Sequence, residues 1–323
     1  MQKNLKVLVI GGAGFIGSYI NKMLNQAGYQ TVVLDNLSQG NRLAVRYGTF
    51  IEGDIGDSQA LQQIFTTYSI DAVMHFAAFI DVGESVAQPA KYYDNNVCKT
   101  LNLLRMMVHY HIPYFIFSST AAIFGNPLLP RLTEDHPCHP INPYGRTKWM
   151  VEKILQDFEV AYGMKSCCLR YFNAAGGDPQ GEIKNYQTQV TNLIPRALRS
   201  VKTGEALTIF GTDYETPDGT CIRDYVHIAD LGKAHLLGLE KLLSGSASLT
   251  YNLGNGQGYS VKEVIQAVKQ VTGHQVLVKE GPRRPGDPAI LLADATKIQR
   301  ELAWSPHYPH LETMIEHAWK ALP

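Results

Sequence analysis

The stretch KVLVIGGAGFIG, residues 6–17, leads an apolar, β-rich run into a series of glycines. Residues 5–10 predict a strand, and the pattern from 15 to about 26 predicts a helix that begins where the glycines end. Gly11, Gly14 and Gly17 allow a tight turn and let backbone N–H groups and the helix N-terminus approach a pyrophosphate. The stretch therefore predicts the first strand, turn and helix of a nucleotide-binding α/β fold.

Alternating strands and helices continue up to about residue 171. Further strands are predicted at 31–34, 49–53, 71–76, 113–118 and 165–171, and helices at 57–68, about 92–109 and 143–162. The strands are almost continuously apolar, which is typical of a parallel sheet covered on both faces. Right-handed crossovers then make the sheet doubly wound, as in a Rossmann-like fold.

The pattern changes after Phe172. Residues 173–191 are polar and rich in glycine, a helix is predicted at about 193–202, and short strands with long loops such as 211–220 follow. Two later helices are expected: one opened by a capping box at Ser260 and Glu263, and one over 311–321. We predict a nucleotide-binding domain at 1–172 and a smaller C-terminal α/β substrate domain at 173–323, with segments near 225–253 returning to the first.

Composition excludes several kinds of partner. Lys+Arg and Asp+Glu each number 29, so no overall field favours nucleic acid or an anionic membrane surface. The five cysteines contain no C-x-x-C pair, and Cys167 and Cys168 fall in a buried strand, so neither a zinc site nor a redox motif is expected. The first apolar run is shorter than the h-region of a signal peptide. These features favour a cytoplasmic enzyme without a metal.

A carboxylate follows the second predicted strand. Asp35 stands where an acid can accept hydrogen bonds from a ribose, which strengthens the nucleotide interpretation of the glycines. A 2′-phosphate would be repelled by this carboxylate, and no arginine follows it at once. The expected cofactor is therefore NAD rather than NADP.

The stretch NPYGRTK, residues 142–148, places Tyr144 and Lys148 on one face of a helix that Asn142 can cap and Pro143 can begin. The ordinary interpretation is a structural helix pair. The alternative is acid–base catalysis, because a lysine charge ~6 Å from the phenol lowers its pKa by about two units. A hydroxyl from residues 118–120, at the end of a strand, would complete such a site.

Together these motifs resemble the extended short-chain dehydrogenases/reductases, and within them the nucleotide-sugar 4-epimerases. The resemblance spans nearly the whole chain and rests on GGAGFIG (11–17), LDNLS (34–38), GDI (53–55), HFAA (75–78), VGES (82–85), YYDNNV (92–97), SSTAA (118–122), NPYGRTK (142–148), LRYFN (169–173), FGTDYETPDGTCIRDY (210–225), YNLGNGQGYSVKEV (251–264) and RRPGD (283–287).

The resemblance implies interconversion of UDP-galactose and UDP-glucose through a 4-keto sugar, with NAD held tightly. Tyr144 would exchange a proton with the sugar 4-hydroxyl, Thr120 would hydrogen-bond the same oxygen, and Lys148 would also hold the nicotinamide ribose. A homodimer formed through the helices at about 92–109 and 143–162 is implied as well.

The site residues carried over by the resemblance form two sets. The cofactor set is Gly11, Gly14, Phe15, Ile16, Gly17, Asp35, Asn36, Ser38, Gly40, Asp54, Ile55, Phe76, Ala77, Ala78, Asn96, Ser118, Tyr144, Lys148 and Tyr171. The substrate set is Thr120, Asn173, Asn192, Leu193, Phe210, Arg223, Tyr225, Arg284 and Asp287. The arginines suit a diphosphate because a guanidinium can donate two hydrogen bonds at once, whereas the alternative for each is a surface salt bridge.

Some positions depart from the family pattern. Ile10, Ile80 and Phe124 replace a common threonine, a lysine or polar residue, and a tyrosine, and residues 182–191 match poorly. Leu291 corresponds to a position whose size influences whether N-acetylated sugars fit, so UDP-N-acetylglucosamine and UDP-pentoses stay open as substrates.

Other functions fit the sequence less well. Related dehydratases and decarboxylases carry acids where Ala121 and Ala122 stand, which favours epimerisation. A non-catalytic NAD sensor would not need the hydroxyl, the tyrosine and the lysine together.

Overall fold

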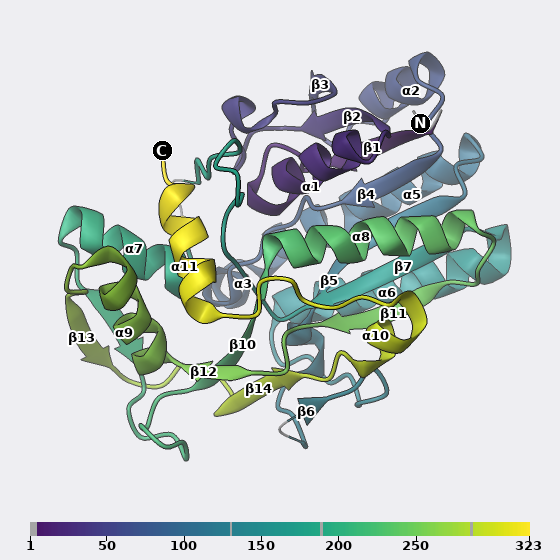
Figure 1. The fold of residues 1–323 in the computed structure, drawn as a ribbon. Coiled ribbons are helices and arrows are strands. Elements are labelled where there is room, and N and C mark those ends of the chain that lie inside the picture. The colour runs from purple at the N-terminus through teal and green to yellow at the C-terminus, as the bar shows by residue number, and fades with distance from the viewer. Residues whose placement is uncertain (1–4, 130, 188–189, 285–286) are drawn as a thin grey trace.

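A computed structural model describes residues 5–129, 131–187, 190–284 and 287–323. Its central feature is a seven-stranded parallel sheet in the order β3-β2-β1-β4-β5-β7-β11 (Figure 1). These strands are β1 Lys6–Ile10, β2 Gln30–Asp35, β3 Thr49–Glu52, β4 Ala72–His75, β5 Tyr114–Thr120, β7 Lys165–Tyr171 and β11 Leu249–Leu253. The predicted doubly wound α/β fold is confirmed.

The strand order reverses at β1. Val7 pairs with Thr31 of β2 on one side and with Ala72 of β4 on the other, so the connections leave β1 in opposite directions. In open parallel sheets this reversal opens a crevice at the carboxyl ends of the strands, where ligands bind. The glycine turn follows β1 and therefore stands at this crevice.

Helices cover both faces of the sheet. They are α1 Phe15–Gln26, α2 Ser58–Thr67, α3 Val82–Ala87, α4 Pro89–Tyr93, α5 Lys99–His109, α6 Pro143–Tyr162 and α8 Ile228–Leu243, with 3-10 turns at Arg42–Ala44 and Ala121–Phe124 and a π turn at Asp94–Cys98. Helices α1 and α8 pack on one face, and α2, α5 and α6 on the other (Figure 1).

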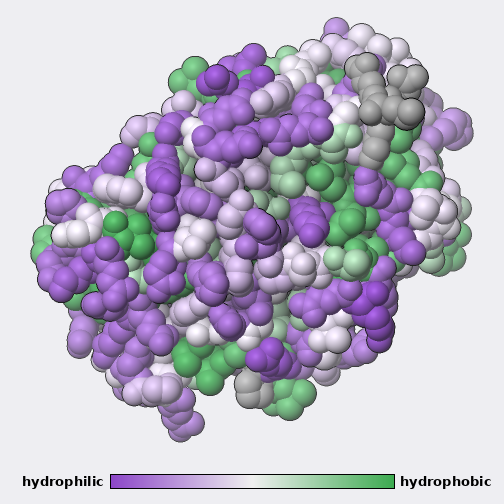
Figure 2. Space-filling model, viewed as in Figure 1, coloured by the Kyte–Doolittle hydropathy of each residue, from purple (hydrophilic) through white to green (hydrophobic). Residues whose placement is uncertain are grey.

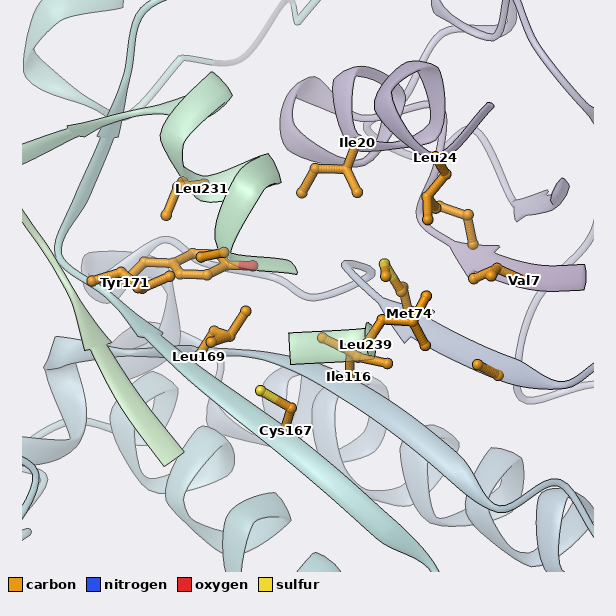
Figure 3. Packing of buried hydrophobic residues seen from close by; sticks show 14 of the residues in the cluster. Val7, Ile20, Leu24, Met74, Ile116, Cys167, Leu169, Tyr171, Leu231 and Leu239 are labelled. Carbon is orange, nitrogen blue, oxygen red and sulfur yellow. The ribbon is translucent and has the colours of Figure 1, made fainter. Parts of the chain in front are cut away.

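The core under α1 and α8 is continuous with the sheet. Ile20 and Leu24 of α1 and Leu231 of α8 are fully buried and share one cluster with Met74 and Ile116 of the strands (Figure 3). Truncating such a side chain to alanine typically costs about 2–5 kcal/mol, so this layer fixes the orientation of α1 and of the turn before it.

Residues beyond 225 contribute to the large sheet. Strand β11 pairs with β7 in parallel, Leu249 opposite Cys167, and α8 packs beside α1. The sequence predicts short strands and long loops after residue 202, whereas residues 228–243 form the 16-residue helix α8. Its buried face includes Gly232, His235 and Gly238, which blurs a helical pattern of apolar residues.

The remaining elements form a second, smaller set. They are β6 Arg131–Leu132, β8 Asn173–Ala175, α7 Leu193–Thr203, β9 Leu207–Phe210, β10 Ile222–His227, β12 Gly258–Ser260, α9 Val261–Thr272, β13 Val278–Gly281, β14 Ile290–Ala293, α10 Thr296–Leu302 and α11 Leu311–Lys320. Helices α7, α9 and α11 share their own apolar cluster. The predicted capping box is present: Ser260 and Glu263 bond each other's backbone N–H groups.

The face drawn in Figure 2 is predominantly hydrophilic, with hydrophobic residues scattered among the polar ones. Within the described ranges, no helix has both the length and the apolar character needed to cross a membrane. All five cysteines are free, and Cys167 and Cys168 are buried in β7, as the sequence predicts.

Candidate active site

A cavity of about 990 Å³ opens at the carboxyl ends of β1, β2, β4 and β5 and extends to β9, β10 and β14. It connects the glycine turn, the Tyr144–Lys148 pair and the downstream arginines in one space. Every residue of the two predicted sets lines this cavity except Asn96.

The glycine turn requires its glycines for steric reasons. Gly11 has φ +75, and a Cβ there would lie 2.6 Å from the backbone nitrogen of Ala77. A Cβ on Gly17 would lie 2.3 Å from the carbonyl oxygen of Gly11. The backbone at the end of β1 therefore touches both the start of α1 and the segment after β4.

Helix α1 presents free backbone donors to the cavity. Its N-cap is Gly14, which has no side chain to accept a hydrogen bond, and Phe15, Ile16 and Gly17 of its first turn line the cavity. A helix N-terminus of this kind carries a partial positive charge and binds phosphate groups through its N–H groups. The structure thus fits the pyrophosphate of a dinucleotide.

Two carboxylates, Asp35 and Asp54, line the cavity near the glycine turn. Asp35 ends β2, accepts hydrogen bonds from the N–H groups of Ala13 (2.9 Å) and Leu37 (2.8 Å), and has a pKa raised chiefly by burial. Burial alone would raise the pKa of Asp54 too, but hydrogen bonds from Gly56, Lys99 and Asn36 outweigh it and hold that pKa below its usual value. Asp35 therefore shapes the glycine turn in addition to facing the cavity.

The Tyr144–Lys148 pair begins helix α6. Asn142 caps the helix by accepting the N–H of Gly145 at 2.8 Å, and Pro143 starts it, as predicted. A Cβ on Gly145 would lie 2.5 Å from the carbonyl oxygen of Ala122, so only glycine lets α6 approach the turn after β5 this closely. This approach brings Tyr144 within hydrogen-bonding reach of Thr120.

Lys148 lies deeper in the same wall. Its ammonium donates to the carbonyl oxygen of Ser118 at 2.8 Å and stands 4.7 Å from the centroid of the Phe117 ring. Burial lowers the pKa of Lys148 to about 7, against the opposing charge of Glu152. Its protonation is therefore balanced near neutral pH.

The electrostatics of Tyr144 differ from the expectation. We expected Lys148 to lower the phenol pKa, but burial raises the pKa of Tyr144, and the hydrogen bond with Thr120 offsets only part of that rise. Enclosure of the phenol in the cavity wall is the dominant effect, because it disfavours the phenolate. The protein alone thus keeps Tyr144 protonated at neutral pH.

The part of the cavity that is lined by β9, β10 and β14, called the far half below, carries most of the predicted substrate residues. Arg284 lays its guanidinium 4.0 Å from the centroid of the Phe210 ring. Arg223 forms an ion pair with Asp287, although 64 residues separate them, and both side chains are mostly buried. Arg223 therefore does form a salt bridge, as the alternative interpretation has it, but the pair lies in the cavity wall with both side chains mostly buried.

The other predicted residues of this half come from several elements. Asn173 starts β8 and donates its amide to the carbonyl oxygen of Asp224 at 2.8 Å. Asn192 is the N-cap of α7, Leu193 its first residue, and Tyr225 lies in β10. Leu291 of β14 and the 46% exposed Ile80 also line the cavity, whereas Phe124 packs behind it against His136 and Arg170.

Asn96 does not reach the cavity. Its amide exchanges hydrogen bonds with both backbone groups of Phe79, each at 3.0 Å, and donates to Thr147 at 3.1 Å. Its neighbour Asn95 lines the cavity instead and donates to Asn96 at 3.0 Å. Asn96 therefore fastens the segment after β4 to α6.

Sequence reasoning missed other lining residues. Arg196 lies one turn into α7 and lines the cavity. Its spacing of four residues from Asn192 on a predicted helix could have revealed it. The segment after β4 also lines the cavity, through Phe79, Ile80, Asp81, Val82, Gly83 and Val86.

Comparison with known proteins agrees with this geometry. The model of the NAD dependent epimerase/dehydratase family matches residues 7–254. The UDP-glucose 4-epimerase of Halalkalibacterium halodurans is 50% identical over 316 residues, which cover 98% of this chain and 95% of that protein.

Solved structures are similar along the whole chain. The UDP-glucose 4-epimerase from Brucella ovis in complex with NAD has a TM-score of 0.95 at 46% identity, covering 98% of this chain and 97% of that one. The UDP-Glc/GlcNAc 4-epimerase of Campylobacter jejuni has a TM-score of 0.85 at 41% identity, covering 98% of each chain. The chain belongs to the NAD dependent epimerase/dehydratase family.

Proposed function

We propose that the protein is a UDP-glucose 4-epimerase, which interconverts UDP-galactose and UDP-glucose. The observation that carries the proposal is the single cavity in which Tyr144, Thr120 and Lys148 lie between an anion-binding glycine turn and the arginines of the far half. One end suits a dinucleotide, the other suits a sugar diphosphate, and the acid–base group stands where the two meet.

The chain before residue 172 supplies most of the NAD site. The first turn of α1 receives the pyrophosphate, Asp35 receives a ribose, and Asp54 and Ile55 flank the adenine. Phe76, Ala77 and Ala78 line the middle of the cofactor, and Lys148 holds the nicotinamide ribose. When bound in its oxidised form, NAD supplies the hydride acceptor and a positive charge.

Tyr144 moves the proton. In its phenolate form Tyr144 takes the proton of the sugar 4-hydroxyl as the 4-keto sugar forms, and the resulting phenol returns that proton when the hydroxyl forms again on the other face. Thr120 shares a hydrogen bond with Tyr144 and holds the same sugar oxygen. Burial raises the pKa of Tyr144. In the proposed mechanism its phenolate form therefore depends on the positive charges of Lys148 and of bound, oxidised NAD.

The far half holds the nucleotide sugar. Arg284 and Arg196 line the cavity, and within the described residues neither side chain forms an ion pair with a carboxylate, so both are available to a diphosphate. Arg223 is oriented by Asp287, and Phe210 offers an aromatic face. Residues 173–323 thus bear the UDP-sugar, apart from α8 and β11, which support the cofactor half.

Substrate range is the second part of the proposal. Leu291 lines the cavity, and leucine is smaller than the tyrosine that some members of the family carry at this position, where it would exclude bulky sugars. Turnover of UDP-N-acetylglucosamine is favoured by the likeness to the Campylobacter jejuni protein, whose name includes that sugar. UDP-pentoses, which lack the C6 group, place less demand on the same space.

A homodimer in the cytoplasm completes the proposal. A second copy would pack against α5 and α6, where Met150, Val160 and Tyr162 expose apolar surface at 40%, 90% and 59%. Molar mass by light scattering tests this: twice the chain mass of 35.9 kDa is expected, and a monomer at all concentrations contradicts it.

The function is tested by incubating the purified protein with UDP-galactose, UDP-N-acetylgalactosamine and UDP-arabinose without added NAD, and analysing the products. We expect the 4-epimer of UDP-galactose, because bound NAD is regenerated in each cycle. Absence of every 4-epimer, even after NAD is supplied, contradicts the proposal. NAD bound without turnover would instead identify a sensor.

A further inference from the structure

Glu152 is a buried carboxylate for which the mechanism above has no use. It lies on α6 four residues after Lys148 and eight after Tyr144, so the three side chains share one helix face. It is only 4% exposed. A charge at such a position needs partners, because burial without them is costly.

Those partners belong to the two strands next to α6. Ser119 of β5 donates its hydroxyl to Oε1 of Glu152, and Arg170 of β7 donates to Oε1 at 3.1 Å and to Oε2 at 2.8 Å. Ser119 and Arg170 stand opposite each other in the sheet. The next pair along the two strands is Thr120 and Tyr171, so Glu152 fastens α6 directly behind the proposed catalytic hydroxyl.

The charge of Glu152 also acts on Lys148. The groups around the ammonium are the Ser118 carbonyl and the Phe117 ring from β5, His75 from β4, and Tyr144 and Glu152 from α6 itself. His75 is buried with a lowered pKa and stays neutral, and Tyr144 stays protonated. Glu152 is the charge that raises the pKa of Lys148 against the effect of burial.

A purely structural role explains this arrangement less well. Replacing a buried ion pair with apolar residues of similar volume is often neutral or stabilising, so the Glu152–Arg170 pair is weak evidence for a role in stability alone. Glu159, on the same helix, shows what a structural carboxylate does here: it joins Lys165 at 2.8 Å and the N–H of Ser248 at 3.3 Å, away from the cavity.

We infer that Glu152, oriented by Arg170 and Ser119, is a positioning residue that keeps Lys148 charged and holds the end of β5 in its catalytic arrangement. The inference rests on the proposed function and adds to it a third member of the helix face formed by Tyr144 and Lys148. Glu152 acts through Lys148 and Ser119 without touching the substrate.

The test compares pH profiles of kcat for the wild type, Glu152→Gln, Glu152→Asp and Glu159→Gln. Activity requires protonated Lys148, so it falls as pH rises through the pKa of that lysine. Loss of the neighbouring charge in Glu152→Gln should move this alkaline limb about one pH unit toward acid. Glu152→Asp keeps the charge, so its alkaline limb should lie close to that of the wild type. Glu159→Gln should leave the alkaline limb at the wild-type position.

Glu152→Gln leaves Arg170 buried without a charged partner, so the double variant Glu152→Gln, Arg170→Leu accompanies it. The pKa of Lys148 is read independently in each variant from the pH dependence of its acetylation by trace acetic anhydride, measured by mass spectrometry. We expect the same acid shift in the single and the double variant.

The outcomes separate the two proposals. Active wild-type protein whose Glu152 variants keep both the alkaline limb and the pKa of Lys148 overturns this inference alone. Wild-type protein that binds NAD but forms no 4-epimer overturns the proposed function, and the inference with it.

Discussion

Lys148 donates a hydrogen bond from its ammonium to the carbonyl oxygen of Ser118 at 2.8 Å, which joins helix α6 to strand β5 two residues before Thr120. The bond fixes the helix that carries Tyr144 relative to the strand that carries the hydroxyl. The remaining ammonium protons are available to a ligand in the cavity.

Lys148→Met should therefore retain the fold but lose turnover by about 10²–10³-fold, since it removes a buried, preorganised charge beside the reacting oxygen. Its control is Lys153→Met, one turn further along α6, where the ammonium reaches Gln156 instead. The measurement is the rate of UDP-galactose conversion at saturating substrate in the two variants and the wild type. Equal losses in the two variants would assign the effect to helix stability.

Tyr144→Phe should lower kcat by about 10²–10⁴-fold, the usual range for a lost acid–base group, and leave thermal stability and NAD content unchanged. Tyr162→Phe, at the exposed end of the same helix, serves as the control. Wild-type turnover in Tyr144→Phe would place the proton transfer on another group.

Gly17→Ala should abolish NAD retention, because the new Cβ would lie 2.3 Å from the Gly11 carbonyl oxygen and force the turn open. Gly14→Ala is the matched control, with its nearest neighbour at 3.4 Å, and should still fold normally. NAD content after purification and the melting temperature report the two effects. A Gly17→Ala protein that keeps its NAD would show that the turn does not hold the cofactor.

Arg284→Gln and Arg196→Gln should each raise KM for the UDP-sugar about 10- to 100-fold, as expected for a lost charge-assisted hydrogen bond of about 1.5–3 kcal/mol. NAD content should not change, because both residues lie in the far half of the cavity. Arg300→Gln, a surface residue with a 72% exposed side chain, is the control. Unchanged KM in both variants would remove these arginines from the diphosphate site.

His75 makes the fold sensitive to acid. Burial, and then the charge of Lys148, lower its pKa to about 3, whereas the unfolded chain has a value of ~6.5. The stability it contributes is complete above pH ~6.5 and is lost as pH falls toward 3, at about 1.4 kcal/mol per pH unit. His227 and His235 act in the same direction, and Asp224, with a pKa of about 6, opposes them.

His75→Phe should reduce this acid sensitivity, since Phe115 and Phe117 already surround the ring. Urea unfolding at pH 5 and pH 7 measures the difference in unfolding free energy between the two conditions, which is independent of any packing change common to both. The exposed His274→Gln should keep the wild-type difference. An unchanged difference in His75→Phe would exclude His75 as its source.

The sequence predicted the parallel sheet well, because buried strands appear as short apolar runs with glycines or acids at their ends. It predicted the cap of α6 from Asn142 and Pro143 for the same local reason. Helix α8 is not predicted from the sequence, because glycines and His235 interrupt the pattern of apolar residues on its buried face. Tertiary packing accommodates these residues.

The sequence does not predict features that depend on three-dimensional context. The π turn at Asp94–Cys98 changes the phase of the helix, so Asn95 faces the cavity and Asn96 does not. The pairing of Arg223 with Asp287 joins segments 64 residues apart. The raised pKa of Tyr144 follows from enclosure, which no spacing of residues along the chain reports.

Strand β11 lies at the border of the large sheet, beside β7, although several elements of the smaller set, such as β8, α7 and β9, precede it in the chain. A fragment ending near residue 172 would therefore leave the edge of β7 that faces β11 unpaired, while the other edge still pairs with β5, and apolar side chains such as Cys167 and Leu169 would lie beside the free edge. Unprotected strands of this kind recruit other chains and aggregate. Premature termination would thus yield a fragment prone to aggregation. In the full chain, β11 prevents this by covering the edge of β7.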